Sequence, residues 1–414
     1  MSKYYCKKLL TKWSSSATNY LSIKDELKLS FVATSLKENT SEPNELFDVG
    51  DTGISLLRSA VIYGANASGK SNVLKAFAFY KQFITDSFKN SQAGETIDVE
   101  TFRLNATTAV EPATMEATFT DGEFIYRYGF EVSSEAVEVE WLYKRACKKR
   151  AKEVELFYRE DDSTTVHPKS PLLQELVNKK MVRNNALLLS TAAQFNETTA
   201  VSILHWLSDT QVLFCSEDEV LWQNAIKHLD DEVMRQRITD FARYADLGIE
   251  SITKIDNRLV SHHRQYDDEG REVNNVSFAF NQNESEGTIK YFSLAYPIID
   301  ALDNGKRVVV DELDSKLHPL LVRRIVALFN DSSTNPKGAQ LLFTAHDTFL
   351  LSAGLFRRDQ VWFTQKNNFG ATELYSLAEY KVRSSSPFEK DYLSGKYGAT
   401  PLIGDMENVF NLMK

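Results

Sequence analysis

The chain has 414 residues, of which 43% are hydrophobic and 25% are charged, and its formal net charge is −9 at pH 7. This composition is ordinary for a globular protein, and the length is sufficient for two or three lobes with buried cores. The negative net charge argues against a protein coated with nucleic acid, although it leaves room for a local basic groove.

The cysteines and the apolar runs indicate a cytoplasmic protein. Cys6, Cys147 and Cys215 are too few and too scattered for a disulfide framework or a zinc site. No apolar run approaches the ~18 residues that a membrane span requires, and no signal-peptide core follows Met1. We therefore expect a protein of the reducing cytoplasm that does not associate with membranes.

The first half of the chain contains a strand, a glycine-rich loop and a helix in succession. Residues 18–35 alternate apolar and polar side chains, which predicts antiparallel strands. After them, an apolar run at 59–63 precedes Gly-Ala-Asn-Ala-Ser-Gly-Lys-Ser at 64–71, and a segment with helical spacing follows. This is G-x-x-x-x-G-K-[ST] in the strand–loop–helix context of a P-loop.

Each part of this loop has a chemical reason. Gly64 and Gly69 allow successive backbone N–H groups to face the α- and β-phosphates. Lys70 supplies a positive charge to the β- and γ-phosphate oxygens, and the Ser71 hydroxyl is a ligand for Mg²⁺. The sequence therefore predicts binding of a nucleoside triphosphate with Mg²⁺.

The segment after this helix predicts further strands and then helices. Residues 96–143 alternate in polarity and contain Asp121-Gly122, a hairpin signal, so we expect an antiparallel β lobe beside the nucleotide core. Six cations between Lys144 and Lys152 form the densest basic cluster, for which we favour a solvated strand end over a contact with nucleic acid. Residues 170–247 have mostly helical spacing without a heptad repeat, which predicts a compact helical lobe.

A hairpin and a helix start are predicted next. Residues 252–280 indicate a hairpin around a turn at 267–270, and we favour an exposed turn over a metal site for His262 and His263. Ser285-Glu286-Gly287-Thr288 then opens an apolar-periodic run, with Ser285 as the expected N-cap.

Two further strands end in polar residues. The apolar run at 307–310 leads into Asp311 and Glu312, and carboxylates at the carboxyl end of a strand lie where α/β sheets bind ligands. We expect Asp311 to hold Mg²⁺ and Glu312 to polarise the attacking water. The run at 340–344 is followed closely by His346.

The distance between the nucleotide motifs indicates a class of P-loop protein. Lys70 and Asp311 are 241 positions apart, so a large insertion must separate them, as in the ATP-binding heads of the ABC, SMC and RecF-like class. We predict an α/β P-loop fold of this type with an antiparallel β lobe and an inserted helical lobe. The expected boundaries are 1–160 for the N-terminal half of the head, 161–250 for the helical lobe and 251–414 for the C-terminal half.

The sequence resembles the RecF/OLD-like (overcoming-lysogenization-defect) ATPases, in particular the short bacterial defence-associated branch typified by AbiL/RloA-type proteins. The resemblance covers nearly the whole chain and is weakest from about 150 to 250. The residues that carry it are Tyr63 to Asn72, Ser285 to Thr288, Val310 to Glu312, Thr344 to His346 and a C-terminal element at 391–401.

This resemblance implies further roles. Asn66 and Asn72 join the nucleotide-binding residues, and His346 corresponds to a switch histidine that contacts the γ-phosphate. Ser285 and Gly287 correspond to the signature motif that one head presents to the nucleotide of another, so a homodimer or higher oligomer is expected. The family further implies antiphage defence, in which the ATPase acts as a switch for a separate effector, a nuclease or a toxin.

Three rival functions stay open or are disfavoured. A RecF-like DNA-binding repair ATPase would show hydrolysis that DNA stimulates in a salt-dependent way. A self-contained ATP-regulated nuclease would need a carboxylate cluster for metals, and the 68 residues after His346 are too few for the Toprim nuclease of long OLD proteins. A GTPase is disfavoured because no Asn-Lys-x-Asp motif is present.

Overall fold

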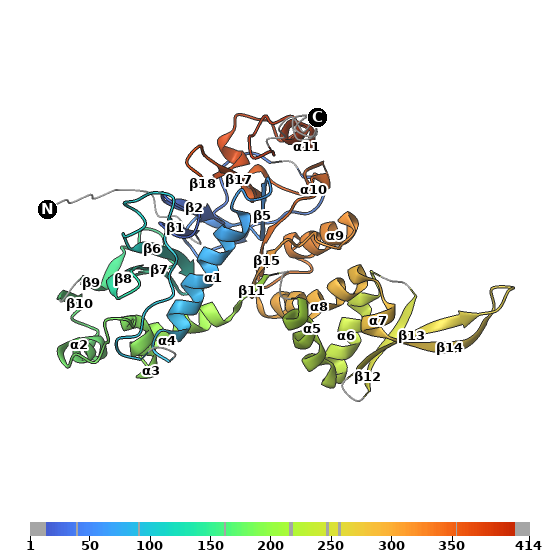
Figure 1. The fold of residues 1–414 in the computed structure, drawn as a ribbon, viewed down its shortest axis with the longest axis horizontal. Helices are drawn as coiled ribbons and strands as arrows, with labels where there is room; N and C mark the ends of the chain where they lie inside the picture. Colours follow the sequence, from blue (N-terminus) through green and yellow to red (C-terminus); the bar gives the residue numbers. More distant parts are fainter. Residues whose placement is uncertain are drawn as a thin grey trace, which may run out of the picture.

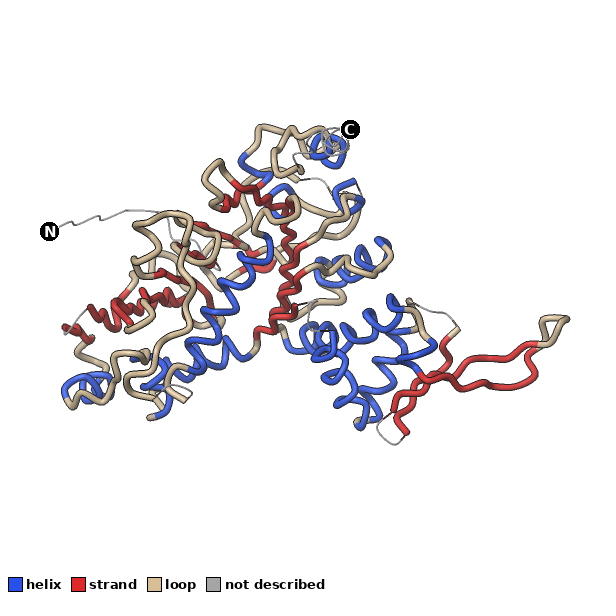
Figure 2. Tube along the Cα trace, viewed as in Figure 1, coloured by secondary structure: helices blue, strands red, loops and turns tan. Residues whose placement is uncertain are grey.

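The computed structural model describes residues 14–38, 40–89, 92–160, 163–214, 218–245, 248–255, 258–352 and 354–401. Within them the chain forms a six-stranded, mostly parallel sheet, a seven-stranded antiparallel sheet and a three-stranded sheet that projects to one side (Figures 1 and 2). None of the described helices is long and apolar enough to cross a bilayer.

The six-stranded sheet is the centre of the molecule. Its order is β11-β15-β16-β5-β17-β18, parallel throughout except for β18. The strands span Thr210–Phe214 (β11), Arg307–Asp311 (β15), Gln340–Thr344 (β16), Ser59–Gly64 (β5), Val361–Lys366 (β17) and Thr372–Ser376 (β18). Its inner strands are nearly continuous apolar runs because both of their faces are covered.

Alternate side chains of β5 enter two different cores. Ala60 and Ile62 pack into a core with the antiparallel sheet and helix α1 (Lys70–Asp86), whereas Val61 and Tyr63 face the other side. That second core contains helices α8 (Glu286–Asn304) and α9 (Pro319–Asn330). The parallel sheet is therefore the middle layer between two cores.

The antiparallel sheet covers the first face. Its order is β10-β9-β8-β7-β6-β1-β2, and the predicted hairpin is confirmed at the β6–β7 turn, where Asp121 Oδ1 accepts the N–H groups of Glu123 and Phe124 (3.0 and 2.8 Å). The strands are Ser14–Thr18 (β1), Leu27–Ser30 (β2), Ala113–Thr120 (β6), Phe124–Val132 (β7), Val137–Ala146 (β8), Val154–Glu160 (β9) and Ser163–Val166 (β10). The cations Lys148, Lys149, Arg150 and Lys152 lie exposed in the β8–β9 connection.

Helix α1 joins this sheet to the central one (Figure 1). Its buried residues recur at helical spacing, from Val73 and Leu74 to Ile84. Tyr80 donates its O–H to the carbonyl of Tyr128 (3.1 Å) and stacks on Phe130 with 5.7 Å between ring centroids. The helix that leaves the glycine-rich loop is therefore anchored in the core of the β lobe.

The interval 161–250, predicted as one helical lobe, is divided between the two cores. Helices α2 (Pro171–Asn178), α3 (Leu188–Gln194) and α4 (Thr198–Ser208) belong to the first core. Helices α5 (Asp218–Lys227) and α6 (Glu232–Ala242) belong to the second. Between the two groups the chain forms β11, which pairs in parallel with β15 and makes this interval part of the central sheet.

The three-stranded sheet forms an arm whose strand β12 packs beside α6 (Figure 1). It consists of β12 (Ile249–Ile255), β13 (Arg258–Tyr266) and β14 (Glu272–Ala279), and the predicted hairpin with its turn at 267–270 is confirmed. The expectation that His262 and His263 lie in an exposed turn is wrong, because both are on β13 with partly buried side chains.

Short elements complete the fold. They are β3 (Phe47–Asp48), β4 (Ser55–Leu56), α7 (Phe280–Asn283), α10 (Phe349–Ser352) and α11 (Phe388–Leu393). The C-terminal element packs on the second core, where Tyr392 lies 5.9 Å from Tyr63 and 5.3 Å from Phe363, centroid to centroid.

Candidate nucleotide site

The glycine-rich loop connects β5 to α1 as the sequence predicts. Strand β5 ends at Gly64, and α1 begins at Lys70 after Gly69, whose φ of 107° lies in the region that favours glycine. A Cβ at Gly64 would lie 2.4 Å from Thr364 Oγ1, and a Cβ at Gly69 would lie 2.1 Å from Thr372 Oγ1. Both glycines are therefore required by the close approach of the β17–β18 hairpin.

A network of hydroxyl groups holds the loop against this hairpin. Ser68 Oγ lies 2.7 Å from Thr364 Oγ1, and the Thr372 hydroxyl donates to the carbonyl of Ser68 (3.0 Å). Thr372 Oγ1 also lies 2.7 Å from Ser22 Oγ, which accepts the amide N–H of Asn72 (2.6 Å). Asn72 therefore contacts the connection between β1 and β2 through Ser22, and its contact with a nucleotide stays a prediction.

The ammonium of Lys70 lies folded back on the loop. Its Nζ donates to the carbonyls of Gly64 (2.8 Å) and Ala65 (3.2 Å), and the side chain is buried. Burial lowers the pKa of Lys70, and the carboxylates of Glu312 and Asp311 oppose that shift.

Asp311 and Glu312 lie at the carboxyl end of β15, next to the carboxyl end of β16. The Thr344 hydroxyl donates to Asp311 Oδ1 (2.7 Å) and accepts the backbone N–H of Glu312 (2.7 Å). Glu312 has a φ of 53°, so the backbone turns sharply directly after Asp311. Thr344 therefore fixes the orientation of both carboxylate residues, a role that no local sequence pattern indicates.

Glu312 and His346 face each other. His346 Nε2 lies 3.6 Å from Glu312 Oε1, and both side chains are nearly half exposed (42% and 46%). The segment at His346 is held by Asp314, whose Oδ2 accepts the backbone N–H groups of His346 (2.7 Å) and Asp347 (2.6 Å). The second oxygen of Asp314, Oδ1, is buried without a hydrogen-bond partner.

These residues line a cavity of about 630 Å³, a volume within the range of ligand sites. Its lining comprises Asn66, Glu312, Asp314, Ser315, His346 and Asp347. Asn66 of the glycine-rich loop, Glu312 and His346 thus meet at one place, although 280 positions separate Asn66 from His346.

The chemistry of the donors is of the kind that Mg²⁺ takes. Ser71, in the first turn of α1, offers a hydroxyl, and Asp311 offers a carboxylate. Within the described part of the chain, no group of three or more His, Cys, Asp or Glu side chains could hold a metal ion. A hydroxyl and a carboxylate fit Mg²⁺, which commonly binds with one or two protein carboxylates plus phosphate oxygens and water.

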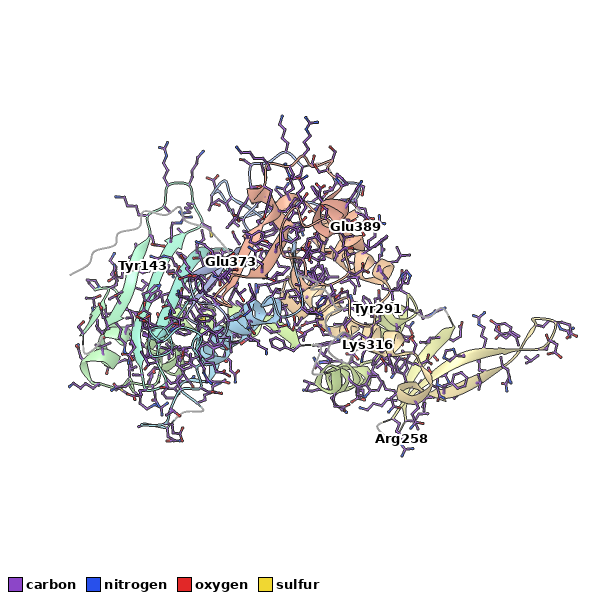
Figure 3. The ribbon with its side chains drawn as sticks, turned by 45° about the horizontal axis from the view of Figure 1, so that its top comes forward. Tyr143, Arg258, Tyr291, Lys316, Glu373 and Glu389 are labelled. Atoms are coloured by element: carbon purple, nitrogen blue, oxygen red, sulfur yellow. The ribbon has the colours of Figure 1, made fainter. Side chains whose placement is uncertain are left out.

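Ser285 and Gly287 lie at the start of α8, on the second face of the sheet. Ser285 is the N-cap, as predicted, and its Oγ accepts the N–H of Thr288 (3.1 Å). A Cβ at Gly287 would lie 2.8 Å from the carbonyl oxygen of Lys316, so this glycine allows α8 to approach the segment after Glu312. Figure 3 labels Lys316 and also Tyr291, which lies further along α8.

The comparisons with known proteins identify a family. The family model described as "AAA domain, putative AbiEii toxin, Type IV TA system" matches residues 59–352, which include every predicted site residue. None of the curated proteins compared with the sequence matches it.

Solved structures are similar at low identity. An SMC head bound to the C-winged helix domain of ScpA is 10% identical, with a TM-score of 0.46 and coverage of 88% of this chain and 98% of that one. The SMC head domain from Thermotoga maritima is 14% identical (TM-score 0.42; 90% and 100% covered). The recombination mediator protein RecF-ATPrS of the RecFOR pathway is 12% identical (TM-score 0.28; 87% and 97% covered).

These similarities are too low to transfer a function. The predicted α/β P-loop fold with an antiparallel β lobe is confirmed by the architecture itself: a mostly parallel central sheet, a strand–loop–helix at the glycine-rich loop and a seven-stranded antiparallel sheet.

Proposed function

The chain belongs to the ATPase family described as "AAA domain, putative AbiEii toxin, Type IV TA system", and we propose that it is a Mg²⁺-dependent ATP switch whose two copies enclose ATP between them. The observation that carries this proposal is the cavity in which Asn66 of the glycine-rich loop meets Glu312 and His346. The conformational change on hydrolysis is then the output of the molecule.

The chain's own residues divide the work of hydrolysis. Gly64 to Lys70 bind the phosphates through backbone N–H groups and one ammonium, which moves from the loop carbonyls to phosphate oxygens. Glu312 orients the water and accepts its proton, and His346, 3.6 Å from that carboxylate, faces the γ-phosphate. Ser71 and Asp311 would hold Mg²⁺, which neutralises charge on the phosphates when bound.

The two-copy arrangement rests on Ser285 to Thr288, which we call the signature segment. Ser285 and Gly287 contact Thr288 and Lys316, and they lie at the N-terminus of a 19-residue helix, a position that favours an anion. We propose that this N-terminus meets the γ-phosphate held by a second copy. Each composite site then needs Lys70 of one copy and Ser285 of the other.

Mixing experiments test this arrangement. Ser285→Arg should leave ATP binding intact but abolish hydrolysis, and Lys70→Ala should weaken binding. A mixture of the two inactive proteins should regain turnover, because each mixed pair contains one intact composite site. Mixtures that stay inactive at every ratio would contradict the proposed pairing.

The biological output follows from the resemblance to defence ATPases. We propose that a separate effector, a nuclease or toxin from a neighbouring gene, is docked on the helices at 165–250 or on the segment after Tyr380. Expression of this chain alone should then be harmless, and removal of the neighbour should abolish phage protection while ATP turnover persists.

The family description supplies a rival, in which this chain is itself the toxic component. Growth arrest on expression of the chain alone, lost in Glu312→Gln, would favour that rival. Cleavage of DNA or RNA by the purified chain would favour the self-contained nuclease instead. Hydrolysis that DNA stimulates would favour a RecF-like repair role.

A further inference from the structure

The arm formed by β12, β13 and β14 packs beside α6 and α7 and projects away from the central sheet (Figures 1 and 2). All residues of β14 except Val276 are exposed, and the hairpin carries exposed apolar side chains such as Tyr266 (55%) and Val273 (58%). Arg258 marks the base of the arm in Figure 3, well away from Glu373 on the hairpin that holds the glycine-rich loop. The arm therefore does not touch the P-loop region directly in this view.

One buried carboxylate ties the arm to the signature segment. Glu284 Oε1 accepts a hydrogen bond from the Ser261 hydroxyl and lies 2.7 Å from His263 Nε2. The Glu284 side chain is only 5% exposed and that of His263 is 15% exposed. A buried carboxylate is stable only when hydrogen bonds or a charge compensate it, so these contacts hold strongly once formed.

The two partners of Glu284 are themselves fixed by the arm. Ser261 and His263 both lie on β13, two residues apart and hence on one face of the sheet. The ring of His263 packs against Phe278 of β14, with 5.1 Å between centroids. His262, on the opposite face, bonds instead to Thr253 (2.8 Å) and Ser277 (3.0 Å) within the arm. The two adjacent histidines thus have different roles.

Glu284 directly precedes Ser285. Strand β14 leads without a linker into α7, whose Phe280 is fully buried against Phe292 of α8 (4.9 Å between centroids). Glu284 and Ser285 are both extended, with ψ of 157° and 151°, so these two residues set the direction in which α8 starts. A movement of the arm against α8 would therefore change the position of the signature segment.

The contact continues from the signature segment to the catalytic edge. Gly287 lies against the backbone of Lys316, and Lys316 lies 3.8 Å from Glu286 across the surface. The Lys316 segment is in turn bonded to the second motif, since the N–H of Ser315 donates to the carbonyl of Glu312 (3.0 Å). The arm, Glu284, the signature segment and Glu312 thus form an unbroken series of contacts.

We infer that Glu284 is a positioning residue: it locks the arm to the signature segment and so sets how Ser285 and Gly287 meet the nucleotide of a second copy. This inference rests on the proposed pairing of two copies. It assigns a function to the His263–Glu284 pair. The position of the exposed arm would then influence the rate of ATP hydrolysis in the site of the other copy.

The first test compares Glu284→Ala with His262→Gln, a matched change on the same strand that leaves Glu284 and its partners in place. Glu284→Ala should lower kcat about 10- to 100-fold, because a small misplacement of a catalytic segment has an effect of that order. ATP binding by the isolated chain should be unchanged, because Lys70 is untouched. His262→Gln should keep the wild-type kcat. Wild-type turnover in Glu284→Ala would overturn the inference.

A mixture separates a positioning role from a general structural one. Glu284→Ala mixed with Lys70→Ala should regain turnover, because one composite site then combines an intact Lys70 with an intact signature segment. If Glu284 acted only within its own chain, this mixture would stay inactive, and that result would overturn the inference. The mixture of Ser285→Arg with Lys70→Ala runs in parallel: if it also fails, the pairing of two copies is wrong, whereas failure of the Glu284→Ala mixture alone rejects only the positioning role.

Milder variants keep the test valid if Glu284→Ala does not fold. Ser261→Ala and His263→Gln each remove or weaken one contact of Glu284 and should give smaller decreases in kcat with unchanged ATP affinity. Glu284→Gln retains an acceptor oxygen for Ser261 and should recover part of the turnover. Equal kcat values for wild type, Ser261→Ala, His263→Gln and Glu284→Gln would reject the positioning role.

Discussion

The glycine-rich loop and the signature segment belong to helices that cover opposite faces of one sheet, and the chain holds them differently. The loop is enclosed by hydroxyl groups of Thr364, Thr372 and Ser22, and its helix α1 is buried in the β lobe. The signature segment touches the catalytic edge through the backbone approach of Gly287 to Lys316, and its strongest side-chain anchor, Glu284, faces the arm. The glycine-rich loop is thus held by contacts within the core of its own chain, whereas the signature segment is held by the projecting arm. This difference is expected if the signature segment acts on the nucleotide of a second copy.

Among the changes at the nucleotide site, Glu312→Gln should lower kcat the most. Loss of the general base should lower kcat about 10²- to 10⁴-fold, while ATP still binds through Lys70 and the loop. Glu286→Gln, an exposed change in the signature segment, is the control and should change kcat far less. Steady-state phosphate release measures both, and hydrolysis at the wild-type rate by Glu312→Gln would refute the assignment.

Lys70→Ala should weaken ATP binding about 10- to 100-fold, the effect of removing a charged hydrogen-bond donor. Lys75→Ala, on the exposed side of the same helix, should leave the affinity unchanged. Isothermal titration with ATP and Mg²⁺ distinguishes the two. Equal affinities would mean that the P-loop does not hold the phosphates.

Thr344→Val should lower kcat about tenfold, because it removes the hydrogen bonds that orient Asp311 and the backbone of Glu312. Thr344→Ser retains the hydroxyl and should recover most of the turnover. If the serine variant is as impaired as the valine variant, packing of the methyl group and not the hydrogen bonds explains the effect.

Thr372→Val should have the smallest effect, a loss of about 1–2 kcal/mol in the free energy of unfolding, because the buried carbonyl of Ser68 and hydroxyl of Ser22 lose their partner. Urea denaturation measures it, with Thr372→Ser as the control. Unchanged stability in Thr372→Val would show that the hydroxyl network does not support the loop.

The parts of the site that the sequence predicts are those with a local pattern. A motif is recognisable from neighbouring residues alone at Gly64 to Ser71 and at Asp311-Glu312. The same holds for the turn at Asp121-Gly122 in the β lobe. Thr372 meets Ser68 across 304 positions, and Asp314 meets His346 across 32, so no local spacing reveals these contacts.

The features that the sequence does not reveal depend on contacts between distant residues for the same reason. Strand β11 has only five residues, which is too short a run for its periodicity to separate a strand from a helix. Its pairing with β15 is what identifies it as a strand. The expectation of an exposed turn for His263 fails because its partner, Glu284, lies 21 positions away and no local pattern indicates that contact.

The most direct test of the central claim is the mass of the Glu312→Gln protein in solution, since this variant should bind ATP without hydrolysing it. Light scattering after size-exclusion chromatography should give about one chain mass of 47.1 kDa without nucleotide and twice that value with ATP and Mg²⁺. The same variant carrying Ser285→Arg should keep the single-chain mass with ATP bound. A single-chain mass for Glu312→Gln at saturating ATP would contradict the claim that two copies enclose the nucleotide.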